Sequence, residues 1–188
     1  MRRRDFLASL PAAAWALSNG SESFAAARTA SVAELQRDWQ KLLAPGAEVA
    51  HSVEPLSKSE AEWKQALDSA QFNILRQEGT ERPFSSPLND EKRPGIFVCA
   101  GCTLPLFSSA MKFDSGTGWP SFFTLIPDHL GTKQDYKLIV PRTEYHCIRC
   151  GGHQGHVFDD GPQPTGLRYC MNGLALAFRP GAAAGAQG

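Results

Sequence analysis

The sequence predicts a mainly β protein of the α+β class, in which short helices precede a small antiparallel β domain. Apolar residues at helical spacing occur before residue 80, whereas short apolar or alternating runs separated by Gly and Pro follow residue 94. The 188 residues include 17 Gly and 13 Pro, which indicates many turns rather than a helical bundle. With 42% apolar and 20% charged residues, the composition is that of a soluble globular protein, and the length suits one domain with appendages.

Residues 1–27 have the pattern of an export signal, which we exclude from the fold. Three arginines at 2–4 precede an apolar run at 6–17, and the small residues at 25–27 suit cleavage. The run is too short to cross about 30 Å of hydrocarbon, so we expect no stable membrane association. The order of residues 3–7 resembles the bacterial twin-arginine signal, with an ordinary secretory signal as the alternative. We therefore expect an exported protein, located in the bacterial periplasm.

Three helices are predicted before the β domain. Apolar spacing predicts a first helix over 31–43, and residues 44–56 are a connection, so that 28–56 form an N-terminal helix and linker. A second helix is predicted to begin at Ser57 or Ser59, each followed three residues later by a Glu that completes a capping box. A third helix passes through 72–75 and ends at Gly79. The main domain is expected over 57–180, with a disordered Gly/Ala-rich tail over 181–188.

Short runs after residue 94 predict the strands of the β domain. The apolar or alternating segments are 96–98, 136–140, 145–148 and 174–178. Gly and Pro separate them, which indicates tight connections and antiparallel pairing.

The charge balance disfavours one class of function. The chain has 19 basic and 19 acidic residues and stays nearly neutral without the signal. A protein that grips a phosphate backbone needs a basic surface, so we expect no nucleic-acid binding.

Four of the five cysteines form two Cys-x2-Cys knuckles, Cys99 with Cys102 and Cys147 with Cys150. A two-residue gap brings both sulfurs to one side of a turn, so two knuckles supply the four thiolates of a tetrahedral Zn2+ site. Four thiolates fill the coordination shell, and this one zinc ion would therefore be structural. Disulfides are an alternative that export favours, and a redox-active pair is another, although it leaves the second knuckle unexplained.

The fifth cysteine, Cys170, is left as a free thiol. A strand over 167–172 would place Arg168, Cys170 and Asn172 on one face. Nearby positive charge favours the thiolate, which is the nucleophilic form. The alternatives are a buried structural cysteine and, for Arg168, an ion pair with a carboxylate such as Asp160.

Two histidines and a tryptophan complete the set of candidate site residues. His153 and His156 follow the second knuckle in what we expect to be a tight loop, free for acid/base chemistry because the thiolates already satisfy the metal. Trp119 is the best candidate for an apolar recognition wall, with core packing as the alternative. The remaining histidines are expected to be structural.

These motifs together resemble the peptide-methionine (R)-S-oxide reductase family, the B type. The resemblance covers about residues 57–179 and rests on the segments 79–84, 99–102, 113–122, 149–158 and 166–172. It implies two small antiparallel sheets with a bound zinc ion, and reduction of R-methionine sulfoxide in proteins with electrons from a thioredoxin-like dithiol. It also implies site roles: Cys170 as the nucleophile, His153, His156 and Asn172 as the polar pocket, Trp119 as the wall that recognises the methyl group, and Cys99, Cys102, Cys147 and Cys150 as zinc ligands. We also expect Phe158 to contact the substrate and Arg168 to belong to the catalytic residues.

One position departs from the family pattern. Many members carry a second, resolving cysteine in the turn before Trp119, where this chain has Thr117. We therefore expect a one-thiol cycle, in which Cys170 becomes a sulfenic acid that an external dithiol reduces directly.

Two other function classes are weaker alternatives. A non-enzymatic zinc-clamped interaction module would not need Cys170. A zinc hydrolase or deaminase would need an open coordination position and a general-base Glu in a motif such as His-x-Glu, which the sequence lacks. We expect a monomeric enzyme.

Overall fold

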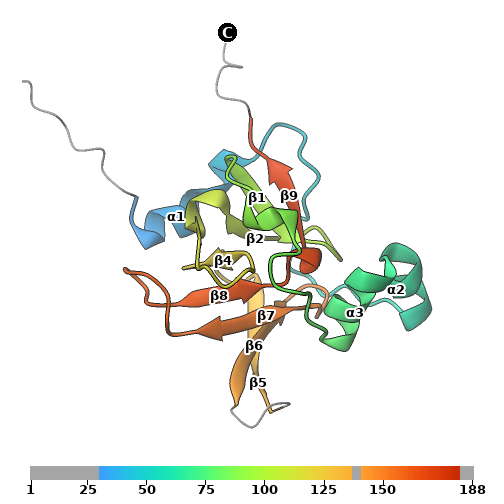
Figure 1. Ribbon diagram of the computed structural model, residues 1–188. Helices are drawn as coiled ribbons and strands as arrows, with labels where there is room; N and C mark the ends of the chain where they lie inside the picture. The colour runs from blue at the N-terminus through green and yellow to red at the C-terminus, as the bar shows by residue number, and fades with distance from the viewer. Residues whose placement is uncertain (1–29, 137–140, 183–188) are drawn as a thin grey trace, which may run out of the picture.

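The computed structural model describes residues 30–136 and 141–182 as two antiparallel sheets with short helices around them (Figure 1). One sheet has three strands in the order β2 (Pro105–Ser108), β1 (Gly95–Cys99) and β9 (Leu176–Pro180). The other has six strands in the order β3 (Lys112–Phe113), β4 (Ser121–Phe122), β8 (Arg168–Met171), β7 (His153–Phe158), β6 (Arg142–Cys147) and β5 (Leu130–Asp135). Every strand pairing is antiparallel, and the predicted fold class is confirmed.

The helices begin where the sequence places caps. Helix α1 (Val32–Asp38) follows Ser31 and continues as the 3-10 turn η1 (Trp39–Leu42). Helix α2 (Glu60–Ala66) follows Ser59, which forms a reciprocal capping box with Glu62. Helix α3 (Ser69–Gln77) is closed by Glu78, which has a left-handed backbone conformation and directly precedes Gly79. Short 3-10 turns are η2 (Pro87–Asn89), η3 (Ser109–Met111) and η4 (Gly173–Ala175).

An aromatic core joins the two sheets. The Phe107 ring from the three-stranded sheet stacks on the Phe122 ring from the six-stranded sheet, with 4.2 Å between centroids. Phe97 from β1 packs edge-on against the same Phe122 ring at 5.0 Å. All three rings are fully buried, so the sheets are held together by apolar contact as well as by the cysteine knuckles.

The strand predictions were partly wrong in position. The run 96–98 lies in β1 and the run 145–148 lies mostly in β6, as predicted. The run 174–178 begins as the turn η4 and becomes strand β9 only at Leu176. Of the run 136–140, residues 137–140 lie outside the described residues, and the neighbouring strand β5 ends at Asp135.

The segment containing the two candidate histidines is a strand and not the tight loop expected. Strand β7 spans His153–Phe158 and is paired with β6 on one side and β8 on the other. The residues Gly-His-Gln-Gly-His carry little intrinsic strand preference, and pairing on both sides overrides it. The two neighbouring strands therefore determine the position of the histidines.

A segment before the main domain crosses both cysteine knuckles. We call residues 44–56 the strap. The Ala50 N–H donates to the Thr103 carbonyl beside the first knuckle, at 3.0 Å, and the Leu56 N–H donates to the Arg149 carbonyl inside the second knuckle, at 2.7 Å. Arg149 in turn donates to the Cys102 carbonyl at 2.9 Å. The strap therefore connects the two hairpins at the point where the cysteines meet.

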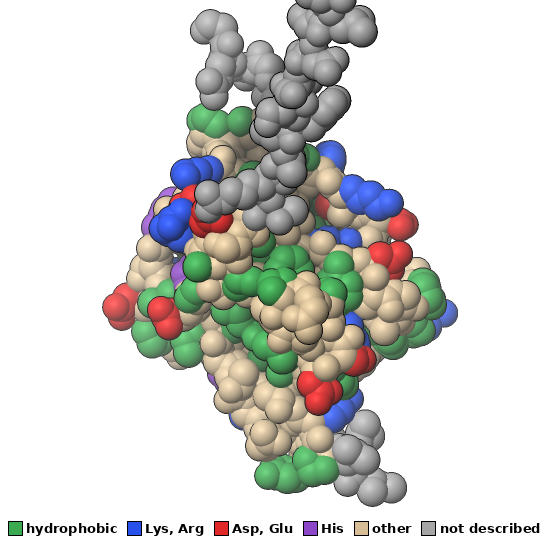
Figure 2. All heavy atoms as spheres, turned by 90° about the vertical axis from the view of Figure 1, so that its left-hand side faces the viewer, with side chains coloured by type: hydrophobic (Ala, Val, Ile, Leu, Met, Phe, Trp, Pro, Cys, Tyr) green, Lys and Arg blue, Asp and Glu red, His purple; other side chains and the backbone are tan. Residues whose placement is uncertain are grey.

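The distribution of charged side chains on the surface agrees with the equal numbers of acidic and basic residues in the sequence. Figure 2 shows acidic and basic side chains near one another around hydrophobic ones on one face of the molecule. Among the described residues, no helix combines the length and the apolar character needed to cross a bilayer.

Candidate active site

Cys170 lies in the middle of the six-stranded sheet and faces a cavity of about 230 Å³. Its strand β8 is flanked by β7, where His156 is the cross-strand neighbour of Cys170, and by β4, where Ser121 is its neighbour. The alternation predicted for 167–172 is present: Arg168 and Cys170 line the cavity, while the ring of Tyr169 packs against Phe107 and Tyr145 in the interior. The cavity is lined by Thr80, Thr117, Trp119, Arg142, Gly155, His156, Phe158, Arg168, Cys170, Met171 and Asn172.

The Cys170 sulfur is in an environment with opposing effects on its ionisation. Burial raises the pKa of the thiol above its ordinary value, because the charged thiolate loses water. The Arg168 guanidinium and a hydrogen bond from Thr117 act in the opposite direction and lower this pKa. The two contacts stabilise the thiolate in a site that is otherwise unfavourable for charge.

Arg168 combines both roles considered for it. It donates Nε and Nη2 to the two oxygens of Asp160, each at 2.8 Å, in a bidentate ion pair. Its guanidinium also lies 4.4 Å from the centre of the Phe158 ring. The arginine is thus fixed in place beside Cys170, and Phe158 helps to position it while lining the same cavity.

His156 is oriented by a carboxylate that the sequence analysis missed. Its Nε2 lies 2.7 Å from Oδ2 of Asp135 at the end of β5, and the same oxygen accepts from Arg142 Nη2 at 2.7 Å. A carboxylate accepts only, so Nε2 carries the hydrogen, and Nδ1 is the nitrogen that takes up and delivers a proton. Burial lowers the pKa of His156, while the bond to Asp135 acts to raise it.

His153 lies beside the cavity but does not line it. Its side chain is 2% exposed, its ring centre lies 5.5 Å from that of His156, and its Nδ1 lies 2.7 Å from Oε1 of Glu144. Burial acts to raise the pKa of Glu144, but hydrogen bonds from His146 and His153 outweigh it and bring this pKa to about 2. His153 Nε2 is buried without a partner in the described structure. A direct role for His153 stays a prediction.

Trp119 and Asn172 are held by one residue of the preceding loop, Glu81. The Trp119 indole N–H donates to the Glu81 carbonyl at 3.2 Å, and the Glu81 N–H donates to Oδ1 of Asn172 at 3.0 Å. The Glu81 carboxylate accepts the backbone N–H groups of Gly173 and Leu174. Trp119 therefore presents its ring to the cavity in a fixed orientation, whereas the Asn172 amide is already engaged in positioning the loop.

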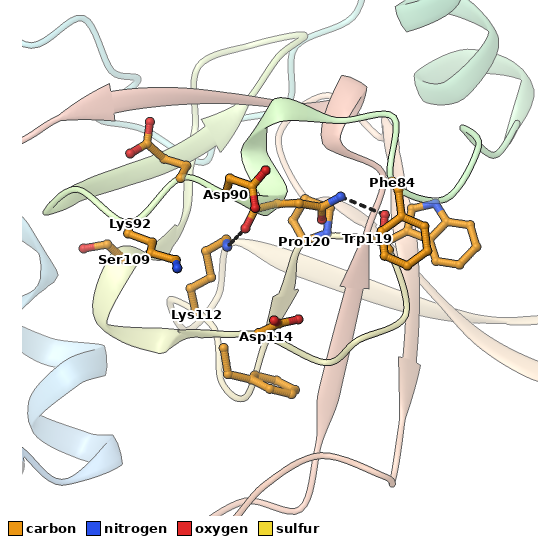
Figure 3. Close-up of a pocket in the computed structure, with 12 residues that line it drawn as sticks. Phe84, Asp90, Lys92, Ser109, Lys112, Asp114, Trp119 and Pro120 are labelled. Atoms are coloured by element: carbon orange, nitrogen blue, oxygen red, sulfur yellow. Dashed lines mark hydrogen bonds between the residues drawn. The ribbon is translucent and has the colours of Figure 1, made fainter.

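Trp119 also lines a second cavity, of about 370 Å³ (Figure 3). Lys112 reaches into it and donates to the Asn89 carbonyl at 2.7 Å, and the Asn89 amide donates to the Gly118 carbonyl at 2.8 Å. Phe84 stands at its rim, 74% exposed, with its N–H bonded to the same Gly118 carbonyl at 2.7 Å. These bonds fix the backbone that carries Trp119.

The four remaining cysteines converge between the two hairpins. Their sulfurs lie within 4.8 Å of one another, with Cys99 and Cys150 3.6 Å apart and Cys102 and Cys147 3.5 Å apart. These separations exclude disulfides, whose sulfurs are about 2.05 Å apart. They are close to the sulfur–sulfur edge of a tetrahedral thiolate site with bonds of about 2.3 Å. The four buried thiolates therefore suit a structural metal ion that pins the β1–β2 hairpin to the β6–β7 hairpin.

Sequence reasoning missed the residues that act behind the cavity. Asp135, Glu144 and Glu81 were not singled out, although each bonds directly to a candidate site residue. Glu144 is the cross-strand neighbour of His156 on β6, a relation that appears only when the strand register is known.

Comparison with known proteins decides the family. A model described as the SelR domain matches residues 67–180. The peptide methionine sulfoxide reductase MsrB of Methanosarcina barkeri is 52% identical over 125 residues, which are 66% of this chain and 88% of that protein. The chain belongs to the peptide methionine sulfoxide reductase B family. The MsrB of Agrobacterium fabrum is 48% identical over 126 residues, covering 66% of this chain and 93% of that protein.

A plant relative has the same domain within a longer chain. The chloroplastic peptide methionine sulfoxide reductase B1 of Arabidopsis thaliana is 52% identical over 121 residues, 64% of this chain and 60% of that protein. All cavity residues and all four clustered cysteines of this MsrB family member lie within the matched range, whereas α1, the strap and α2 precede it.

Proposed function

We propose that the protein repairs oxidised proteins by reducing R-methionine sulfoxide to methionine, with Cys170 as the nucleophile. Membership of the methionine sulfoxide reductase B family supports the reaction. The single observation that carries the assignment of residues is the placement of Cys170 in a cavity beside His156, Arg168 and Trp119.

The proposed reaction balances with one thiolate and one proton. The Cys170 thiolate attacks the sulfoxide sulfur, and His156 delivers a proton to the oxygen, because a sulfoxide becomes electrophilic when its oxygen is protonated or hydrogen-bonded. Two electrons pass from the cysteine to the substrate. The new sulfur–sulfur bond and the substrate S–O bond then break as the hydroxyl group passes to the Cys170 sulfur, which leaves a sulfenic acid on Cys170 and releases methionine.

Chirality follows from three different environments around the cavity. An indole wall at Trp119 suits the methyl group, the polar side at His156 suits the oxygen, and the open mouth must take the rest of the side chain. Only one epimer then points its sulfur at Cys170. We assign this preference to the R form, in agreement with the family.

The sulfenic acid is returned to the thiol by an external, thioredoxin-like dithiol. Thr117 occupies the place of a resolving cysteine, and the other four cysteines form the buried cluster. The dithiol is oxidised to a disulfide and water is released. Intact mass after one turnover without reductant should show one added oxygen, whereas an internal disulfide would contradict the one-thiol cycle.

The metal proposed for the cysteine cluster is zinc, held by Cys99, Cys102, Cys147 and Cys150. Four thiolates at tetrahedral separation favour Zn2+, and the absence of an open position assigns it a structural role. Bound zinc would also protect these thiols from oxidation in an exported protein. Metal analysis of the purified protein should give about one zinc per chain.

We further propose that the protein acts as a monomer in the bacterial periplasm. The signal pattern at 1–27 supports export, and the oligomeric state is tested by the mass of the purified protein in solution. Replacing Arg3 and Arg4 by Lys should abolish export of zinc-loaded protein if the twin-arginine route is used; unchanged export would exclude that route.

One experiment tests the central assignment. Each sulfoxide epimer is incubated with a dithiol and the wild type or Cys170→Ser. The wild type should reduce the R epimer alone, and the variant should be inactive. Activity retained by Cys170→Ser would favour the alternative of a non-enzymatic module.

A further inference from the structure

Three hydroxyl groups form a chain that ends at the Cys170 sulfur. Thr117 Oγ1 lies 2.8 Å from Ser115 Oγ, which lies 2.8 Å from Ser121 Oγ. Ser121 Oγ donates to the Trp119 carbonyl at 3.2 Å. At the other end, Thr117 lines the cavity together with Cys170, and its hydroxyl acts on the thiol in the direction that lowers the pKa of Cys170. The chain therefore leads from the cavity at the reacting sulfur to a main-chain acceptor beside the substrate wall.

One bond of the chain can run in one direction only. A carbonyl oxygen accepts, so Ser121 is the donor whenever it bonds to Trp119, whereas each hydroxyl–hydroxyl bond can run either way. Every hydroxyl has a single hydrogen to give. The direction of one bond therefore determines the direction of the next.

Two arrangements use every hydroxyl hydrogen. With a Cys170 thiol, the S–H donates to Thr117, Thr117 to Ser115, Ser115 to Ser121, and Ser121 to the Trp119 carbonyl. With a thiolate, the direction reverses: Ser121 turns from the Trp119 carbonyl and donates to Ser115, Ser115 donates to Thr117, and Thr117 donates to the sulfur. The reversal needs rotation of three hydroxyl groups and no movement of heavy atoms, in a segment where Ser121 is fully buried.

We propose that Thr117, Ser115 and Ser121 form a reversible hydrogen-bond chain that stabilises the Cys170 thiolate before attack. The residue at the place of the resolving cysteine of other family members thus takes part in the reaction, because Thr117 lines the cavity with the reacting sulfur and favours its thiolate form. This inference rests on the proposed nucleophilic role of Cys170. The chain offsets part of the penalty that burial imposes on a charged sulfur.

The other charged groups around Cys170 come from three elements and from the loop before β8. Arg168 lies on the same strand and is paired with Asp160 in that loop. His156 faces Cys170 from β7, and Tyr145 on β6 donates its hydroxyl to the Cys170 carbonyl at 3.1 Å. Because these groups are unchanged in variants of the hydroxyl chain, their contribution to the ionisation of the sulfur cancels in the comparison.

The test is the pH dependence of Cys170 alkylation, which requires no turnover. The full-length, metal-loaded protein is treated with iodoacetamide across a pH series, and the Cys170 peptide is quantified by mass spectrometry. Thr117→Val keeps the shape and removes the hydroxyl. We expect it to move the midpoint upward by about one pH unit, the size associated with one hydrogen bond to a charged group. Thr117→Ser keeps the hydroxyl and should restore the wild-type midpoint.

Ser115→Ala should give a shift of the opposite sign. Without Ser115, the Thr117 hydroxyl has only the Cys170 sulfur left as an acceptor. When the sulfur is a thiolate, the hydroxyl donates to it; when the sulfur is a thiol, the Thr117 hydrogen has no acceptor in the chain, so the thiolate is favoured. The midpoint should therefore move down. Thr132→Val, an exposed position on β5, is the matched control and should match the wild type.

The outcomes separate this inference from the proposed function. An unmoved midpoint in Thr117→Val, or shifts of the same sign in Thr117→Val and Ser115→Ala, would overturn the chain. Because alkylation is independent of catalysis, either result leaves the reductase assignment intact. Conversely, a protein that shows the expected midpoints but reduces neither epimer would overturn the proposed function alone.

Discussion

Replacing Asp135 by Asn tests whether His156 is the acid that protonates the sulfoxide oxygen. The Nε2–Oδ2 distance is 2.7 Å and both side chains are nearly buried, so the bond is charge-assisted and poorly screened. A hydrogen bond to a charged group contributes about 1.5–3 kcal/mol. The imidazolium loses this contribution in Asp135→Asn, and the pKa of His156, already lowered by burial, falls further.

The expected decrease in the reaction rate follows from the two ionisations that the reaction needs. The reactive form has a charged His156 and a Cys170 thiolate, although the pKa of His156 is lowered and that of Cys170 is raised. At pH values between the pKa of His156 and the pKa of Cys170, the fraction of protein in the reactive form is constant. This fraction decreases tenfold for each unit by which the pKa of His156 falls. We therefore expect a plateau rate roughly 10- to 100-fold lower, with its acidic edge displaced to lower pH.

The assay is a single turnover without reductant, in which methionine formed per Cys170 is followed by rapid quench across pH. KM for the sulfoxide should change little, because Asp135 does not line the cavity. Asp159→Asn, an exposed position that makes the same charge change, is the matched control. A plateau within twofold of the wild type, with an unmoved acidic edge, would refute the assignment of His156 as the acid.

Three further predictions concern the supports of the site. Cys102→Ser removes one of four metal ligands, and metal analysis should find well under about one ion per chain together with a lower unfolding temperature; full occupancy would contradict the ligand set. Leu56→Pro removes the strap N–H that bonds to the second knuckle, and release of metal to a chelator should accelerate roughly fivefold, whereas the exposed Val53→Pro should not change it. Gly155→Ala places a Cβ against the Cys170 carbonyl oxygen, so the free energy of unfolding measured in urea should fall by about 1–3 kcal/mol. An unchanged unfolding midpoint would mean that β8 can move aside without cost.

The features predicted correctly from the sequence are those set by local interactions. The cap at Ser59 needs only Glu62 three residues away, and each knuckle needs only two cysteines in one turn. The alternation around Cys170 is likewise a property of one short strand. Such features survive folding because the contacts that create them lie within a few residues.

The missed features depend on pairing between distant segments. Strand β7 has weak intrinsic preference, and it exists because β6 and β8 bond to both of its edges. Asp135 reaches His156 only through the register of β5 on β6 and of β6 on β7. Since the sequence analysis placed the strand at 136–140, after the end of β5, Asp135 could not be aligned with His156.

Gln154 connects the metal cluster to the catalytic strand within a single residue. Its side-chain amide donates to the Cys99 sulfur at 3.4 Å, while its carbonyl accepts the Asn172 backbone N–H at 2.9 Å. Gln154 is fully buried and lies between His153 and Gly155 on β7. A displacement of the cysteine cluster would therefore also displace β7, which carries His156, and the end of β8, which carries Cys170. Under the proposed roles, a metal site that takes no part in the chemistry would therefore still affect activity, because the proposed nucleophile Cys170 and the proposed acid His156 keep their separation only while the knuckles hold the two hairpins in register.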